Sequence, residues 1–273
     1  MSEIQVPKIQ AVILDWAGTV LDHGSRAPMG AFVRAFAEFG VTISIDDARG
    51  PMGMAKRDHI RAVGQAPGVA AAWLDAHGRP MSETDIDNVM AVFEPMNIAS
   101  VEAHADFIPG ALEALAILRS RGIRVGATTG YTRPIMNVLA PIAADSGYIP
   151  EITVCAGDLP QGRPSPLMMW HAMSHMGIWP AETVVKVDDT IPGIGEGVAA
   201  GTWTIGLSLS DNMCGLSAEE LAALDEPAIQ AIRENATTAF TDAGADLVID
   251  SIAQLPWAIT QINAWLADGH LPG

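Results

Sequence analysis

Six short runs of apolar, largely β-branched residues recur along the chain. They cover Ala11–Leu14, Ile123–Thr129, Ile152–Cys155, Thr183–Val187, Thr202–Leu207 and Asp246–Ile249. Runs of this length and composition predict buried strands. Between most of them lie stretches with helical spacing of apolar residues, such as Ala111–Arg121 and Pro166–Met176. This alternation predicts an α/β fold with a doubly wound parallel sheet.

The interval between the first two predicted strands breaks this alternation. Residues 21–105 contain apolar positions with helical spacing, and Phe32, Phe36 and Phe39 share one helical face. We predict a helical cap domain over residues 21–105, inserted into a core of residues 1–20 and 106–273. The alternative is a set of extra helices layered on the sheet.

Composition supports one large α/β core with a single insertion. The chain has 273 residues, of which 49% are hydrophobic and 17% charged, so it can bury a sizeable core. Its formal net charge of −17 argues against partners such as nucleic acid or an anionic membrane surface. A small anionic substrate would need a pocket that gathers some of the few cations.

Neither targeting nor cysteine patterns indicate an unusual compartment. The first ten residues lack a basic segment followed by an apolar stretch, and no run of about 18 apolar residues occurs. We therefore expect a cytoplasmic protein. Cys155 and Cys214 match no metal or redox spacing, so we expect ordinary thiols.

Polar residues gather where the predicted strands end, which is the edge at which open parallel sheets bind ligands. The residues concerned are Asp15, Thr128, Thr129, Gly130, Asp188 and Asp189, with Arg163 preceding the fourth strand. Two carboxylate sites can hold Mg²⁺, which prefers oxygen ligands. Asp15 could then attack phosphorus, with Thr129 and Arg163 holding the phosphoryl oxygens. A single Asp at a strand end would otherwise be explained as a turn or helix cap.

These residues resemble the four motifs of the haloacid dehalogenase superfamily. Within it, the chain resembles the phosphonatase family, through Asp15-Trp-Ala-Gly-Thr19, Pro51-Met-Gly-Met-Ala-Lys-Arg-Asp-His59 and Thr129-Gly-Tyr-Thr-Arg133. The resemblance implies Mg²⁺-dependent hydrolysis of the carbon–phosphorus bond of phosphonoacetaldehyde, giving acetaldehyde and phosphate. It also implies a homodimer joined through the caps. The phenylalanine stripe offers an apolar surface for that contact, unless it faces the cap interior.

Ala17 carries information about the leaving group. Ordinary phosphatases of this superfamily have an Asp at this position, which protonates a departing alkoxide. An alanine cannot do so. Cleavage of a carbon–phosphorus bond leaves a carbanion, which needs an electron sink more than a local acid.

Lys56 is the candidate for that sink, because a lysine imine accepts electrons to form an enamine. His59 would share its helical face and could shuttle protons during imine formation. The alternatives are a solvated lysine and a structural histidine. For the amine to be neutral its pKa must fall, which we attribute to desolvation, with Arg57 or a protonated His59 adding repulsion. Lys8 and Lys186 are less well placed, since one precedes the first strand and the other lies inside a strand.

The remaining site residues follow the family resemblance. Met52, Thr128, Gly130 and Tyr131 are expected to bind substrate, with core packing as the alternative for Met52 and Tyr131. We assign Asp15, Ala17, Asp189 and Asp188 to the metal site. Some family members have Gly before the conserved Asp of the fourth motif and a further Asp after it, whereas here Asp188 and Gly193 occupy those positions. By register Asp189 is the direct ligand, and Asp188 lies further out or substitutes for it.

Two rival functions stay open at this point. One is a phosphomonoesterase of the same superfamily acting on a small phosphate ester, which Ala17 disfavours. The other is a non-catalytic scaffold that binds Mg²⁺ or phosphate and works through protein contacts. The intact set of Asp15, Thr129, Arg163 and Asp189 disfavours the scaffold.

Overall fold

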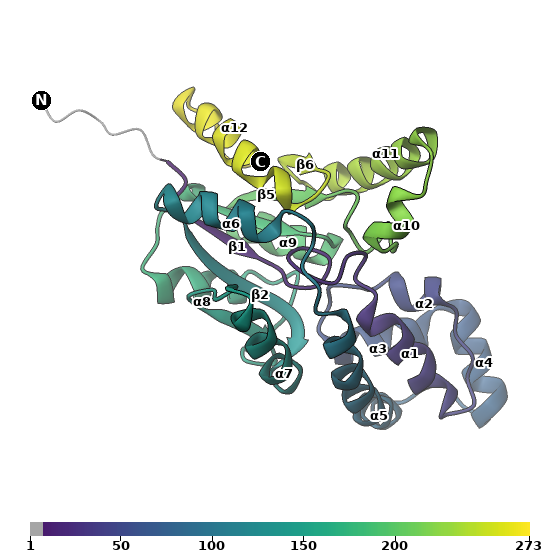
Figure 1. The fold of residues 1–273 in the computed structure, drawn as a ribbon. Coiled ribbons are helices and arrows are strands. Elements are labelled where there is room, and N and C mark those ends of the chain that lie inside the picture. Colours follow the sequence, from purple (N-terminus) through teal and green to yellow (C-terminus); the bar gives the residue numbers. More distant parts are fainter. Residues whose placement is uncertain (1–7) are drawn as a thin grey trace, which may run out of the picture.

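A six-stranded parallel sheet forms the centre of the molecule (Figure 1). The computed structural model describes residues 8–273. Most of the first ten residues, from which we expected a cytoplasmic protein, therefore lie outside the described residues. The strands are β1 (Ala11–Leu14), β2 (Arg124–Thr132), β3 (Thr153–Ala156), β4 (Val184–Asp188), β5 (Trp203–Leu207) and β6 (Leu247–Ile249). Their order is β3-β2-β1-β4-β5-β6. All six predicted strands are confirmed.

Helices cover both faces of this sheet. Successive strand residues point to opposite sides, so the sheet has two apolar faces to bury. Val12 and Leu14 of β1 pack in one hydrophobic cluster with α6 (Ala111–Ser120), α7 (Arg133–Asp145) and α12 (Leu255–Ala267). Ala11 and Ile13 pack in another with α8 (Leu167–Met176). The helices α9 (Ile191–Ala200) and α11 (Glu226–Asp242) share a third cluster. The doubly wound arrangement is thereby confirmed.

Five helices between β1 and α6 form the cap, which Figure 1 shows gathered at one end of the sheet. They are α1 (Ala27–Ala37), α2 (Ile45–Arg49), α3 (Lys56–Gln65), α4 (Pro67–His77) and α5 (Glu83–Val101). Their apolar side chains form a hydrophobic cluster of their own around Phe32, Trp73 and Phe93. A separate core distinguishes an inserted cap from helices layered on the sheet. The exact boundaries at residues 21 and 105 stay a prediction.

The phenylalanine stripe lies inside the cap and does not form an outer surface. Phe32 and Phe36 are fully buried, and Phe39 is partly buried against the same cluster. Phe32 stacks on Phe93 with ring centroids 4.2 Å apart. The expectation that this stripe offers a dimer surface is wrong, because α5 covers the apolar face of α1.

Short elements complete the fold. They are α10 (Ala218–Ala222) and three 3₁₀ turns, η1 (Glu102–His104), η2 (Ala181–Thr183) and η3 (Ile252–Gln254). Within residues 8–273, no helix combines the length and the apolar character needed to cross a bilayer. Both cysteines are free thiols.

Candidate active site

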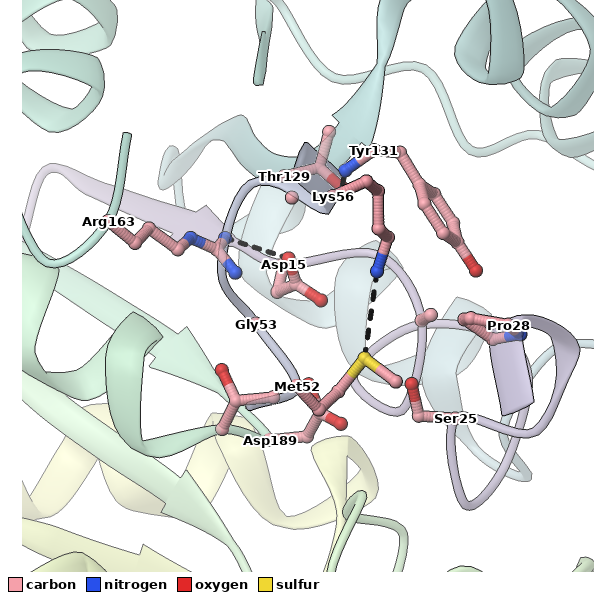
Figure 2. Close-up of a pocket in the computed structure, with 13 residues that line it drawn as sticks. Asp15, Ser25, Pro28, Met52, Gly53, Lys56, Thr129, Tyr131, Arg163 and Asp189 are labelled. Carbon is pink, nitrogen blue, oxygen red and sulfur yellow. Dashed lines mark hydrogen bonds and ion pairs between the residues drawn. The ribbon is translucent and has the colours of Figure 1, made fainter. Parts of the chain in front are cut away.

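A small cavity lies where the carboxyl ends of β1, β2 and β4 meet the cap. Its volume is about 20 Å³, and nine of the twelve residues expected at the site line it. These are Asp15, Ala17, Met52, Lys56, Thr129, Gly130, Tyr131, Arg163 and Asp189. Figure 2 shows the amine of Lys56 and the carboxylate of Asp15 directed into the same space. The other three, His59, Thr128 and Asp188, lie outside the lining.

Asp15 directly follows β1 and is paired with Arg163. Nη2 of Arg163 donates to Oδ1 of Asp15 at 2.7 Å, and both side chains are buried. Burial raises the pKa of Asp15 to about 6, although Arg163 opposes the shift. Arg163 lies in the turn before α8, a few residues ahead of the helix it was expected to open.

A buried ion network behind the cavity holds Arg163 in place. Its guanidinium also contacts Asp188 at 3.3 Å and Glu196 at 3.1 Å. Lys186 of β4 contacts the same two carboxylates at 3.0 and 3.2 Å. Sequence reasoning set Lys186 aside because it lies inside a strand, and it did not identify Glu196. Side chains two positions apart in a strand project on the same side, so the spacing of Lys186 and Asp188 was the sequence signal that could have predicted their contact.

The two threonines at the end of β2 have different surroundings. Thr129 lines the cavity, and its Oγ1 accepts from the Tyr131 backbone N–H at 3.1 Å. Thr128 lies behind the cavity, where its hydroxyl donates to Glu196 and accepts from Lys186 at 2.7 Å. The carbonyl of Thr128 accepts from Arg163 at 2.7 Å. Thr128 therefore supports the ion network, and Thr129 faces the site.

Asp15, Asp188 and Asp189 form a buried cluster whose oxygens lie within 4.8 Å of one another. Burial and the neighbouring carboxylates raise the pKa of Asp189 well above its usual value. Among residues 8–273, its oxygens accept only from the Asn212 backbone N–H at 3.1 Å and the Thr19 hydroxyl at 3.5 Å. A cation bound between Asp15 and Asp189 would relieve this repulsion, so the donor set fits Mg²⁺.

Asp188 differs from Asp189 because protein cations already neutralise it. Burial alone would raise the pKa of Asp188, but Arg163 and Lys186 hold it below the usual value. Its Oδ1 accepts from the backbone N–H and the hydroxyl of Thr190, at 3.0 and 2.7 Å. These contacts favour Asp189 as the direct metal ligand and place Asp188 with the ion network.

The departure in the fourth motif has a spatial explanation. A Cβ added at Gly193 would lie 2.0 Å from Cγ of Asp188, so the Asp188 carboxylate occupies the space of a side chain at position 193. The Asp188 side chain in this position therefore requires glycine at position 193. A side chain extending from α9 at position 193 would collide with this carboxylate.

Lys56 begins α3 of the cap, and its side chain is only 3% exposed. Its Nζ lies 3.6 Å from Sδ of Met52 and 5.1 Å from the centroid of the Tyr131 ring. Burial lowers the pKa of Lys56 to about 8, against the attraction of Asp15. The alternative of a solvated lysine is wrong, and burial raises the neutral fraction of the amine above that of an ordinary lysine.

The expected neighbours of Lys56 lie elsewhere. Arg57 points to the cap surface, where it pairs with Glu83 and Asp87 at 2.9 and 2.7 Å. The repulsive cation that helps to lower the Lys56 pKa is Arg163 instead. His59 is fully buried in the cap, with Nε2 2.6 Å from the Ala48 carbonyl and its ring stacked on Phe32. Burial, followed by Lys56, lowers the pKa of His59 well below its usual value.

Four further residues line the cavity that sequence reasoning did not identify, namely Ser25, Pro28, Gly53 and Thr190. Gly53 brings the cap against the core, because a Cβ there would lie 2.2 Å from Oγ1 of Thr190. Ser25 lies in the connection into the cap and Pro28 in the first turn of α1, both shortly after the first motif but outside it. The fourth-motif pattern includes Thr190, whereas no local pattern indicated Ser25 or Pro28.

Comparison with known proteins places this geometry in a family. A model of haloacid dehalogenase-like hydrolases matches residues 9–201. The chain is 49% identical over 264 residues to a phosphonoacetaldehyde hydrolase of Paraburkholderia phytofirmans, covering 97% of this chain and 99% of that one. The chain belongs to the phosphonoacetaldehyde hydrolase family of haloacid dehalogenase-like hydrolases.

Further relatives agree with this placement. A Vibrio cholerae phosphonoacetaldehyde hydrolase is 47% identical over 97% of this chain and 98% of its own length. The crystal structure of a phosphonoacetaldehyde hydrolase like protein from Oleispira antarctica superposes with a TM-score of 0.96 at 38% identity, covering all of both chains. The resemblance seen in the sequence motifs is confirmed.

Proposed function

We propose that the protein hydrolyses the carbon–phosphorus bond of phosphonoacetaldehyde to acetaldehyde and phosphate. The observation that carries this proposal is a buried lysine amine facing the Asp15 carboxylate in one small cavity, with Ala17 where an ester phosphatase needs an acid. The names and high identity of the relatives support it.

The first step joins the aldehyde to Lys56. The neutral amine attacks the carbonyl carbon, and loss of water gives an imine (Schiff base) that takes up a proton. A pKa of about 8 leaves roughly one amine in ten neutral at pH 7, far more than an ordinary lysine offers. His59 is predicted to shuttle protons here. Its Nε2 is engaged with the Ala48 carbonyl, whereas Nδ1 has no hydrogen-bond partner among the described residues, so Nδ1 is the nitrogen that could carry the proton.

The second step transfers the phosphoryl group to Asp15. An Asp15 oxygen attacks phosphorus, and the electrons of the carbon–phosphorus bond move into the protonated imine, giving an enamine. Arg163 and Thr129 hold the phosphoryl oxygens. Asp15 and Asp189 would hold Mg²⁺, with the backbone carbonyl of Ala17 as the further ligand that the family resemblance implies, and the ion would supply positive charge that offsets repulsion between the carboxylate and the phosphoryl group.

The last steps return the enzyme to its starting state. The enamine carbon takes a proton, and water hydrolyses the resulting imine to acetaldehyde and free Lys56. Water also cleaves the aspartyl phosphate, releasing phosphate and the Asp15 carboxylate. Met52 and Tyr131 bound the space around the amine, so they exclude bulk water while the imine exists.

One assay separates this proposal from its rivals. Purified protein with Mg²⁺ is given phosphonoacetaldehyde, and acetaldehyde and phosphate are measured, with a panel of small phosphate esters beside it. We expect both products in equal amounts from the phosphonate and little phosphate from the esters. Ester hydrolysis without phosphonate turnover would support a phosphomonoesterase, and no turnover on either class would support a scaffold.

Three finer expectations belong to the same proposal. Mg²⁺ is the expected metal, because the buried carboxylate cluster offers hard oxygen ligands. The cytoplasmic location and the homodimer through the caps stay predictions. The dimer surface has to lie outside the phenylalanine stripe, which the cap interior occupies.

A further inference from the structure

The cavity is too small for substrate in the state described. Its volume of about 20 Å³ is close to the space of a single water molecule. A phosphonate therefore enters only after the cap moves away from the core. Contacts that bridge the cap and the core decide how often this happens.

One cap side chain makes several such contacts. Arg49, at the end of α2, reaches across to the core loop after β5. Its Nη1 donates to the backbone carbonyl of Asn212 and to Oδ1 of Asn212 at 3.4 Å. Nδ2 of Asn212 donates back to the Arg49 carbonyl at 3.2 Å. The bonds run in both directions across the interface.

The core side of this contact is shaped to receive the guanidinium. A Cβ at Gly215 would lie 2.5 Å from Cζ of Arg49, so only glycine leaves the space free. The Asn212 backbone N–H donates to Oδ2 of Asp189 at 3.1 Å, which fixes the loop to the expected metal ligand. The loop that receives Arg49 is therefore hydrogen-bonded directly to a residue of the site.

The cap side leads to the reacting amine. The carbonyl of Arg49 accepts from the Met52 backbone N–H at 3.1 Å, and Met52 contacts Lys56. An unbroken series of contacts thus runs from Asp189 through Asn212 and Arg49 to Met52 and Lys56. Displacing Arg49 would loosen the cap segment that carries the amine.

We propose that Arg49 and Asn212 form a latch that holds the cap closed, with Arg49 acting as a positioning residue for Lys56. The catalytic part of this inference rests on the proposed function, whereas closure itself does not. Removing the latch should raise the fraction of open cap and should leave the core folded.

The three lysines of the chain provide an activity-independent test. Lys8 is exposed, Lys56 is buried under the cap, and Lys186 is buried in the sheet. Short pulses of acetic anhydride followed by mass spectrometry report cap opening at Lys56 and general loosening at Lys186. Lys8 corrects for the dose of reagent.

In Arg49→Ala we expect acetylation of Lys56 to increase about tenfold or more, since several hydrogen bonds of a charged group are lost. Labelling of Lys186 should not change. Arg34→Ala, which removes an exposed arginine on α1, is the matched control and should behave as the wild type. Asn212→Ala keeps the backbone N–H to Asp189 and should also expose Lys56, so the test remains if Arg49→Ala does not fold.

Unchanged Lys56 labelling in Asn212→Ala and in any folded Arg49→Ala, or a parallel rise at Lys186, would overturn the latch. Kinetics adds a second readout. Both latch variants should lower kcat/KM for phosphonoacetaldehyde, whereas Arg34→Ala should not. If the wild type shows no phosphonate turnover but the labelling pattern holds, the proposed function fails and the latch stands.

Discussion

Asp188 and Asp189 are adjacent, yet their removal should change stability in opposite directions when no metal is bound. In Asp188→Asn, the amide keeps an acceptor for Thr190 but presents an NH₂ group toward Arg163 and Lys186. Two buried cations then lose a shared carboxylate. In Asp189→Asn, a carboxylate without a cationic partner is replaced by a neutral group.

The magnitude follows from the burial of the Asp188 pairs. Breaking a buried ion pair by removing one partner costs about 3–5 kcal/mol. For a chain of this length, 1 kcal/mol corresponds to about 2–4 °C in Tm, so Asp188→Asn should lower Tm by at least about 6 °C. The pKa of Asp189 is raised on folding, so its ionised form lowers stability at neutral pH. Asp189→Asn should therefore leave Tm unchanged or raise it.

Thermal unfolding in a chelator and again in Mg²⁺ measures both effects. The wild type and Asp188→Asn should gain Tm when Mg²⁺ is added, whereas Asp189→Asn should gain much less. Calorimetric titration with Mg²⁺ should show the larger loss of affinity in Asp189→Asn. A stable Asp188→Asn protein together with a destabilised Asp189→Asn protein would refute the assignment of the two carboxylates.

Three shorter predictions concern pH, the leaving group and assembly. Because Lys56 must be neutral to attack and its pKa is about 8, kcat/KM should rise with pH through about 8 and level off above it; a profile flat from pH 6 to 9 would contradict this. Ala17→Asp places a negative charge beside the phosphoryl site and should impair phosphonate turnover, as measured by acetaldehyde release; full activity would remove the leaving-group argument. Sedimentation at micromolar concentration should give a homodimer, and a monomer would end that prediction.

The sheet could be predicted from sequence because the strands β1, β4 and β5 are buried throughout and β2 is buried along most of its length. Such strands are continuous apolar runs, and the polar residues that follow them mark the ligand edge. Asp15, Thr129 and Gly130 line the cavity for this reason, whereas Met52 and Lys56 of the cap were expected there from the family resemblance. The cap could be located but not oriented, because helical spacing shows that Phe32 and Phe36 share a face without showing that α5 covers it.

The errors at the site have a common physical cause, which is that local spacing gives direction but not the partner. Arg57 is adjacent to Lys56 but pairs with carboxylates on the cap surface. Lys186 was set aside because it lies inside a strand, and a charged residue there needs buried counter-charges that the sequence did not reveal. Here Asp188 and Glu196 supply them, one of them from a helix ten residues further along the chain.

The most direct test of the mechanism is to trap the covalent adduct on Lys56. Wild-type protein is treated with borohydride in the presence of phosphonoacetaldehyde and Mg²⁺, and the adduct is located by mass spectrometry. Lys56→Arg keeps the positive charge but cannot form the imine, so it separates charge from covalent chemistry. We expect substrate-dependent inactivation with a two-carbon adduct on Lys56, and loss of nearly all turnover in Lys56→Arg. An adduct on Lys8 or Lys186, or an active Lys56→Arg enzyme, would contradict the imine mechanism and return the protein to the phosphomonoesterase hypothesis.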